Sequence, residues 1–167
     1  LLSKNINPNI LKDVLLLFNK TAIEVCEGQQ SDMNFECQEN VSISEYIEMI
    51  RKKTSVLLGC ALKIGAMMAS ASSEDKDDIY EFGINIGIAF QIQDDILDVE
   101  SSTEEMGKSR GSDVSNKKST YTSLLGLSKS KDRASSLYKE SIEALEVFEH
   151  KADPLRVLAN FIISRTY

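Results

Sequence analysis

Apolar residues recur every three or four positions along almost the whole chain, and this helical spacing is the strongest constraint on its fold. No convincing run alternates with period two, so we expect no β-strands. The predicted helices cover residues 9–27, 44–71, 73–98, 119–128, 132–149 and 153–166. The chain is therefore expected to be all-α, with helices long enough to form a bundle.

Particular residues predict where these helices begin and end. Gly28 is a stop signal for the first helix, and the polar residues 29–40 then form a loop. Ser42 and Glu45 have the spacing of a capping box at the start of the second helix. A serine at 72–73 caps the third helix, whose first turn is rich in acids that favour a helix N-terminus.

Residues 100–118 interrupt the helical pattern, because they are rich in serine, glycine and charge and lack an apolar stripe. They are predicted to form a mobile, lid-like loop with a short helical turn near 103–106. The 167 residues fit one domain, or a large part of one.

Composition argues against several classes of protein. Hydrophobic residues make up 42% of the chain and charged residues 27%, which is ordinary for a globular protein. No apolar run reaches the roughly 18 residues of a membrane-spanning helix, so no membrane span is expected. The net charge of −7 argues against nucleic-acid binding, which depends on cations that neutralise phosphates.

The three cysteines and the single histidine give little support for other chemistries. Cys26, Cys37 and Cys60 are odd in number and have no C-x-x-C spacing, so neither a zinc site nor disulfides are expected. A reducing, cytoplasmic location follows. His150 is the only histidine, which disfavours a hydrolase triad.

Charge is divided into two blocks. Residues 74–105 contain 11 acids and one base, whereas residues 106–133 contain seven bases and two acids. Two solvated surfaces would explain this pattern. The alternative is an acidic metal site beside cations that hold a phosphate.

The most informative segment is the acidic end of the third helix. Asp94 and Asp98 are four residues apart and share a helix face, with Asp95 three residues before Asp98 and Gln91 one turn earlier. A buried helix with three carboxylates needs a counter-charge. A hard divalent cation such as Mg²⁺ supplies it through oxygen ligands. Alternatively, these acids lie in solvent at a helix end.

Two glycines, Gly83 and Gly87, continue this stripe at four-residue steps. They predict either close packing of another helix or room for a ligand. A calcium loop beginning at Asp94 is the weaker interpretation, because Ile96 and Val99 would stand where a ligand and a glycine are required.

Cations occur on both sides of this segment. Lys53, followed by Thr54, lies in the second helix and can hold a phosphate oxygen, although taken alone the pattern favours a lysine that only reaches to solvent. Lys108 and Lys118 bracket the polar loop, which either folds over an anion or is a solvated linker.

The order of these motifs resembles the trans-prenyltransferases, the head-to-tail isoprenyl diphosphate synthases, and most closely the bacterial short-chain farnesyl/geranylgeranyl type. The resemblance covers essentially the whole chain. Residues 90–98 look like the family's second aspartate-rich motif. The other matching segments are Lys53-Thr54, the G-Q-x-x-D segment at 28–32, the late loop at 107–121 and the last helix at 161–165.

The resemblance implies a role for each matching residue. Asp94, Asp95 and Asp98 would bind Mg²⁺, or Mn²⁺ in its place. The allylic diphosphate would contact Lys53 and Lys108, with Lys118 holding the diphosphate or the closing loop. Thr54 and Gln91 would lie beside the ionising carbon, and Gln29 and Asp32 would line the same cavity.

The resemblance also implies a reaction and its partners. The enzyme would condense an allylic diphosphate with isopentenyl diphosphate in short-chain isoprenoid biosynthesis, through metal-assisted ionisation to a carbocation. The fold would be the helical bundle of isoprenoid synthases, here a partial bundle. A homodimer is implied for the full-length protein.

The sequence departs from the family at one important point. The first aspartate-rich motif and its paired arginines do not occur. Residues 1–167 therefore look like the C-terminal portion of a single synthase domain, and the isolated chain is expected to be inactive. The alternative is a non-catalytic, diphosphate-binding helical subunit, or degenerate fragment, that pairs with another chain. A terpene cyclase is a weaker alternative, because cyclases as a rule lack the late lysine loop.

Overall fold

The computed structural model describes residues 7–106 and 119–165, apart from the side chains of residues 102–106. Within those ranges the chain is helical and contains no strand, which confirms the all-α prediction. The elements in order are α1 (Pro8–Phe35), α2 (Ile43–Ile50), the π-helical segment η1 (Arg51–Ser55), α3 (Val56–Met68), α4 (Ser73–Met106), α5 (Tyr121–Leu125), α6 (Leu127–Glu143), the 3₁₀ segment η2 (Glu146–Ala152) and α7 (Asp153–Ser164).

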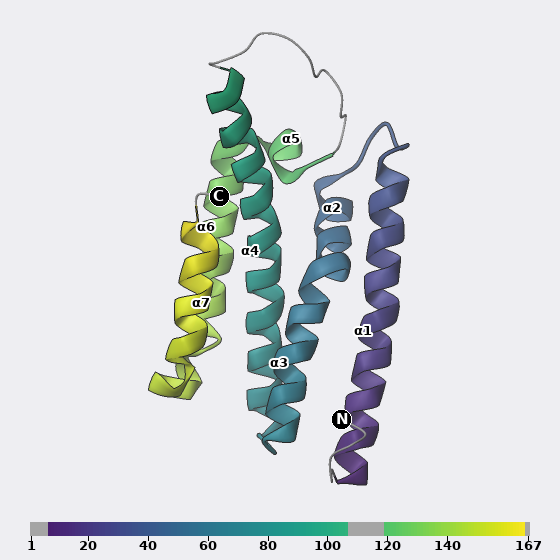
Figure 1. Cartoon of the computed structure of the whole chain (residues 1–167), viewed down its shortest axis with the longest axis vertical. Coiled ribbons are helices and arrows are strands. Elements are labelled where there is room, and N and C mark those ends of the chain that lie inside the picture. The colour runs from purple at the N-terminus through teal and green to yellow at the C-terminus, as the bar shows by residue number, and fades with distance from the viewer. Residues whose placement is uncertain (1–6, 107–118, 166–167) are drawn as a thin grey trace.

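Helix α4 lies at the centre of the molecule (Figure 1). Helix α3 and η1 pack against one side of it and α6 with α7 against the other, while α1 lies outermost, against η1 and α3. The short helix α5 contacts α2, α4 and α6. The largest fully buried apolar side chains come from several of these elements and include Val14, Ile50, Val56, Phe82, Ile92, Ile96, Leu137 and Leu145.

The predicted helix starts at 42 and 72 are confirmed. Ser42 Oγ accepts a hydrogen bond from the Glu45 N–H at 3.3 Å, and Glu45 Oε2 accepts one from the Ser42 N–H at 2.8 Å. At the start of α4, Ser72 Oγ accepts from the Asp75 N–H at 3.0 Å. These side chains satisfy N–H groups that have no partner inside the helix.

Gly28 does not end α1, which corrects the prediction of a loop from residue 29. The helix continues to Phe35. A Cβ atom at Gly28 would lie 2.3 Å from the backbone nitrogen of Lys53, far inside van der Waals contact. Gly28 is therefore needed for close packing of α1 against η1, and not for a turn.

Two glycines of α4 allow it to pack closely against η1 and α3, on the side opposite α1. A Cβ atom at Gly87 would lie 2.7 Å from Ser55 Cα, and one at Gly83 would lie 2.6 Å from Gly59 Cα. Of the two explanations offered by the sequence, close helix packing is the correct one for this stripe.

Other boundaries also differ from prediction. Helix α4 continues to Met106, so residues 100–102 are helical and not part of a loop, and the helical turn predicted near 103–106 is the end of this helix. Packing of α6 alongside α4 explains this extension, and Lys131 Nζ lies 2.6 Å from Glu100 Oε1 across the two helices. Gly126, with φ of 83°, divides the predicted 119–128 helix into α5 and the start of α6. Helix α6 begins before residue 132 and ends at Glu143, and η2 follows.

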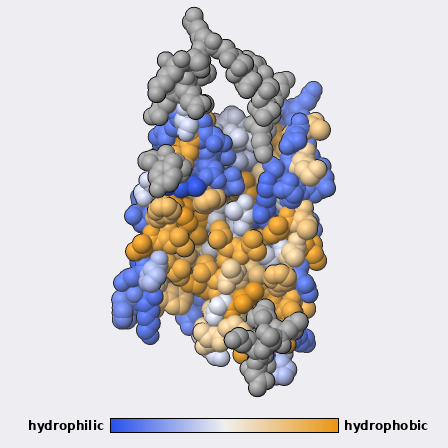
Figure 2. All heavy atoms as spheres, in the orientation of Figure 1, coloured by the Kyte–Doolittle hydropathy of each residue, from blue (hydrophilic) through white to orange (hydrophobic). Residues whose placement is uncertain are grey.

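Large apolar side chains remain exposed on the outside of the described bundle. Figure 2 shows apolar residues gathered across the middle of one face, with hydrophilic residues above them. The exposed residues include Leu16, Phe18 and Ile23 of α1, Leu57 of α3, and Val157 and Phe161 of α7. None of the described helices is both long enough and apolar enough to cross a membrane, as the sequence predicts.

Candidate functional site

A polar cavity of about 320 Å³ lies between α1, α2, η1 and α4. It is lined by Asp32, Tyr46, Met49, Ile50, Lys53, Gln91, Asp94, Asp95, Asp98 and Thr120. Six of the predicted site residues are in this set, although they come from three helices separated by up to 66 positions in the sequence. The fold thus brings the lysine of the second predicted helix to the acidic end of the third.

Lys53 enters the cavity from the π-helical segment. The N–H of Val56 donates to the carbonyl of Arg51, five residues earlier, which is the hydrogen bond of a π turn. Lys53 Nζ lies 2.6 Å from Asp32 Oδ2 of α1. The Lys53 side chain is 33% exposed and that of Asp32 is 9% exposed, so the pair lies at the inner wall of the cavity.

Two other predicted site residues, Thr54 and Gln29, do not line the cavity. Thr54 Oγ1 lies 3.5 Å from Gln91 Oε1, which joins η1 to α4 at the limit of a hydrogen bond. Gln29 is exposed on α1 and is not among the residues that line the cavity. Lys108 and Lys118 lie outside the described residues.

Asp94 is held by Arg165, a residue to which the sequence assigned no role. The guanidinium Nη2 of Arg165 donates to Asp94 Oδ1 and, at 3.3 Å, to the carbonyl of Phe90. It also stacks over the Phe90 ring, 4.1 Å from the centroid. Arg165 follows the last residue of α7, so this contact fixes the end of α7 on α4.

Asp95 faces the interior, away from Asp94. Its Oδ2 accepts a hydrogen bond from Tyr46 Oη at 2.7 Å and one from the Tyr121 N–H at 2.8 Å. Its backbone carbonyl accepts one from Thr122 Oγ1 at 3.4 Å. Asp95 is only 5% exposed, whereas Asp98, one turn further, is exposed at the rim.

The aspartates do not converge on one point. No group of three His, Cys, Asp or Glu side chains is placed to hold a metal ion anywhere in the described part of the chain. Asp94 and Asp98 line the cavity with Lys53, and the Asp95 carboxylate is occupied by Tyr46 and Tyr121. The three-aspartate ligand set therefore remains a prediction.

Burial controls the protonation of the Asp95–Tyr46 pair. It raises the pKa of Asp95, an effect that the hydrogen bonds from Tyr46 and the Tyr121 N–H oppose and the charges of Asp98 and Asp94 reinforce. Burial also raises the pKa of Tyr46, and the negative charge of Asp95 adds to this rise. The Tyr46 hydroxyl therefore stays protonated near neutral pH and donates to the carboxylate.

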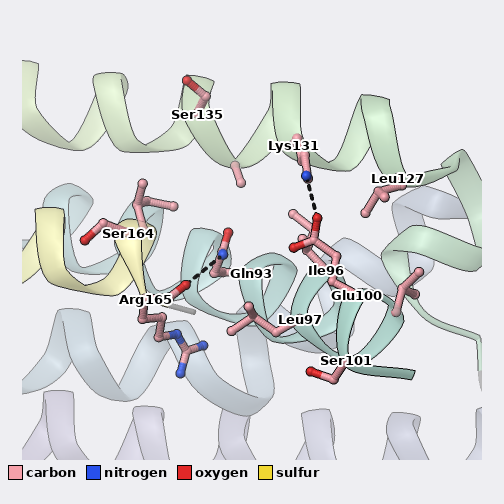
Figure 3. Close-up of a pocket in the computed structure, with 13 residues that line it drawn as sticks. Gln93, Ile96, Leu97, Glu100, Ser101, Leu127, Lys131, Ser135, Ser164 and Arg165 are labelled. Atoms are coloured by element: carbon pink, nitrogen blue, oxygen red, sulfur yellow. Dashed lines mark hydrogen bonds and ion pairs between the residues drawn. The ribbon is translucent and has the colours of Figure 1, made fainter. Parts of the chain in front are cut away.

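A second, larger cavity of about 830 Å³ lies on the opposite flank of α4, against α6 and the end of α7 (Figure 3). Gln93 Nε2 donates to the carbonyl of Arg165 at 3.4 Å, and the Lys131–Glu100 ion pair crosses this cavity between α6 and α4. The cavity also touches Ile96, Leu97, Leu127 and Ile163. Arg165 lines this cavity and pairs with Asp94, which lines the first one.

The family model described as polyprenyl synthetase matches residues 1–155. The chain belongs to this family. It is 50% identical over 98 residues to the geranylgeranyl diphosphate synthase of Methanosarcina mazei, a match that covers 59% of this chain and 30% of that protein. It is 33% identical over 165 residues to the geranylgeranyl diphosphate synthase of Cyanophora paradoxa, covering 98% of this chain and 55% of that protein.

Solved structures share the fold. The geranylgeranyl pyrophosphate synthetase of Pyrococcus horikoshii is 30% identical, with a TM-score of 0.85, and the match covers 98% of this chain and 62% of that one. The synthetase of the archaeon Geoglobus acetivorans is 29% identical, with a TM-score of 0.84, covering 97% of this chain and 60% of that one. The family and the isoprenoid synthase fold predicted from the motif order are confirmed. This family member spans about a third to a little over half of its curated relatives.

Proposed function

We propose that residues 1–167 are the C-terminal portion of a single trans-prenyltransferase domain. The complete enzyme condenses an allylic diphosphate with isopentenyl diphosphate, head to tail, to make short-chain isoprenoid diphosphates. One observation carries this proposal: Lys53, Gln91, Asp94 and Asp98, which the motif order assigns to one substrate, line one cavity although they lie on two separate elements. Family membership and the names of the relatives support it.

Within this proposal the cavity binds the diphosphate of the allylic substrate. The Lys53 ammonium has three donors, so it can donate to a phosphate oxygen while it keeps its bond to Asp32. Thr54 and Gln91 face the carbon that ionises, where their oxygens steady positive charge. The apolar helix faces below the cavity keep water away from the cation.

A divalent metal fits the donor set of this cavity. Asp94 and Asp98 present carboxylate oxygens one helical turn apart, and Mg²⁺ or Mn²⁺ commonly binds to one or two carboxylates and completes its shell with phosphate and water. Such an ion withdraws negative charge from the leaving diphosphate. Asp94 would hold the ion after releasing Arg165, and Asp98 would bind from the rim. Lys108 and Lys118 would add positive charge to the same diphosphate.

The chain alone is proposed to be inactive in turnover, because the first aspartate-rich motif and its arginines are missing from the sequence. The second candidate is a non-catalytic, diphosphate-binding helical subunit that pairs with another chain; the retained Lys53, Asp94 and Asp98 favour the first candidate over it. The full-length protein is proposed to be a cytoplasmic homodimer. Product formation from dimethylallyl and isopentenyl diphosphates by the purified chain would overturn the proposed inactivity.

The diphosphate site is tested by calorimetric titration with inorganic diphosphate in the presence of Mn²⁺. Replacing Lys53 by Ala is expected to weaken binding about 10- to 100-fold, since a hydrogen bond to a charged group contributes about 1.5–3 kcal/mol. The matched control is Lys63→Ala, which removes a lysine that pairs with Asp77 at 2.6 Å, away from the cavity. Equal affinity of the Lys53 variant and the unaltered chain would overturn the assignment.

A further inference from the structure

The second aspartate of the motif differs from its neighbours in what its carboxylate contacts. Asp95 is buried, and both of the hydrogen bonds to its side chain come from distant elements: Tyr46 of α2 and the N–H of Tyr121, the first residue of α5. All three acids line the cavity, but Asp94 pairs with Arg165 and Asp98 is exposed at the rim. The three acids of one motif therefore have different environments.

The contact with Tyr121 supplies an acceptor that α5 itself lacks. The first N–H groups of a helix have no acceptor within that helix. Tyr121 is 3% exposed, so its N–H has little access to water, and leaving it unpaired would be costly. The side chain of Thr120, the N-cap of α5, accepts from the N–H of Ser123 and leaves that of Tyr121 unpaired. Asp95 thus completes the start of α5.

The same contact places Thr120 at the cavity. Thr120 lines the cavity, as Asp98 does. The next residue, Tyr121, is fixed by its hydrogen bond to Asp95 and by the ring of Tyr46, whose centroid lies 6.3 Å from that of Tyr121. Asp95, Tyr46 and Tyr121 therefore join α4, α2 and α5 around one carboxylate.

We propose that Asp95 is a positioning residue and not a metal ligand: it fixes the start of α5, and with it Thr120, at the edge of the diphosphate cavity. The metal part of this inference rests on the proposed function. The positioning part rests only on the hydrogen bonds.

Asparagine separates the two roles. Asp95→Asn removes the negative charge that a metal needs but keeps an oxygen that accepts from Tyr46 and the Tyr121 N–H. Asp95→Ala removes both. A metal ligand is lost in either variant, whereas a positioning acceptor is rescued by Asn.

The first measurement is hydrogen exchange of the peptide that covers residues 119–125. Protection in Asp95→Asn is expected to stay within about threefold of the unaltered chain, and in Asp95→Ala to fall at least tenfold. Tyr46→Phe gives a smaller loss, and Tyr138→Phe on α6 serves as the matched tyrosine control. Equal protection in the Ala variant and the unaltered chain overturns the positioning role. If the Ala variant does not fold, a tenfold loss in the Asn variant overturns it.

The second measurement is Mn²⁺ binding with inorganic diphosphate, followed by electron paramagnetic resonance. Asp94→Asn and Asp98→Asn are expected to weaken Mn²⁺ binding at least tenfold, and Asp95→Asn less than twofold. A loss in Asp95→Asn equal to that in Asp94→Asn overturns the proposal. Failure of the unaltered chain to bind Mn²⁺ with diphosphate contradicts the proposed function instead, and the exchange measurement then decides the positioning role alone.

Discussion

Asp94 and Asp95 are adjacent in the sequence, yet their side chains point to different parts of the molecule. Successive residues of an α-helix are about 100° apart around its axis, so one carboxylate meets Arg165 and the other meets Tyr46. The burial of Asp95 was open to prediction, because it follows Ile88 and Ile92 at core spacing. Its partners were not, because Tyr46 and Tyr121 lie 49 and 26 residues away.

Burial of the Tyr46 hydroxyl, reinforced by the charge of Asp95, makes the stability of the fold depend on pH in the alkaline range. An unfolded tyrosine ionises near pH 10, whereas the raised pKa of Tyr46 keeps the folded state protonated above that pH. The folded state then binds more protons than the unfolded state. The stability contributed by Tyr46 is therefore complete below pH 10 and is lost as pH rises, by about 1.4 kcal/mol per pH unit.

Urea unfolding at pH 8, 10 and 11 measures this loss. The chain has no tryptophan, so tyrosine absorbance reports ionisation directly. In Tyr46→Phe the free energy of unfolding should fall less between pH 10 and 11 than in the unaltered chain. Part of the fall should remain, because burial also raises the pKa values of Tyr80 and Tyr121. An unchanged slope in Tyr46→Phe would contradict the assignment of this effect to Tyr46.

At the scale of elements, η1 is held between two glycine contacts. Gly28 of α1 presses on the backbone of Lys53, and Gly87 of α4 presses on Ser55. Because both contacts involve backbone atoms or a short side chain, neither side can yield easily. The position of the Lys53 ammonium therefore depends on Gly28 and Gly87, two residues that have no side-chain functional group.

Gly28→Ala is expected to destabilise the chain by about 1–3 kcal/mol, the usual cost of overpacking, and to weaken diphosphate binding as Lys53 shifts. Gly65→Ala in α3 is the matched control, because an added Cβ there meets nothing within 4 Å. It should stabilise the chain by up to about 1 kcal/mol through helix propensity. Urea denaturation of both variants provides the comparison, and equal stabilities would show that the Gly28 contact is relaxed in solution.

The sequence predicted the existence of the helices better than their ends. The serine caps were readable because a capping box is local, with Ser42 and Glu45 only three residues apart. The continuation of α1 through Gly28, and of α4 beyond Asp98, depends on partners elsewhere in the chain. For the same reason the cavity's lysine and acids were predictable as types, whereas Arg165 and Tyr46 were not predictable as their partners.

At the scale of the whole molecule, large apolar side chains of α1, α3 and α7 are exposed to water. Leu16 and Ile23 are seven residues apart, so they lie on one face of α1, and each is more than half exposed. Burial of apolar surface drives association at about 25 cal/mol per Å². The chain should therefore associate with itself as its concentration rises.

Sedimentation velocity between about 5 and 200 µM is the measurement for this association, over a range in which hydrophobic contacts of micromolar strength become visible. Ile23→Glu should shift the distribution toward the monomer, because it places a charge within the apolar face. Lys139→Gln, at an exposed polar position on α6, should leave the distribution unchanged. A concentration-independent monomer would show that the apolar face stays solvated.

The π turn at Arg51–Ser55 also bears on how the length of this helix can vary. Such a turn fits one more residue into a helix than the α-helical repeat would hold. Deleting one residue there would therefore restore the α-helical repeat and leave the helical parts on either side in place, so Gly59 would still pack against Gly83. Deleting a residue from the regular α-helical part would instead rotate everything that follows by about 100°. This helix is therefore expected to tolerate the loss of one residue within Arg51–Ser55 better than anywhere else along its length.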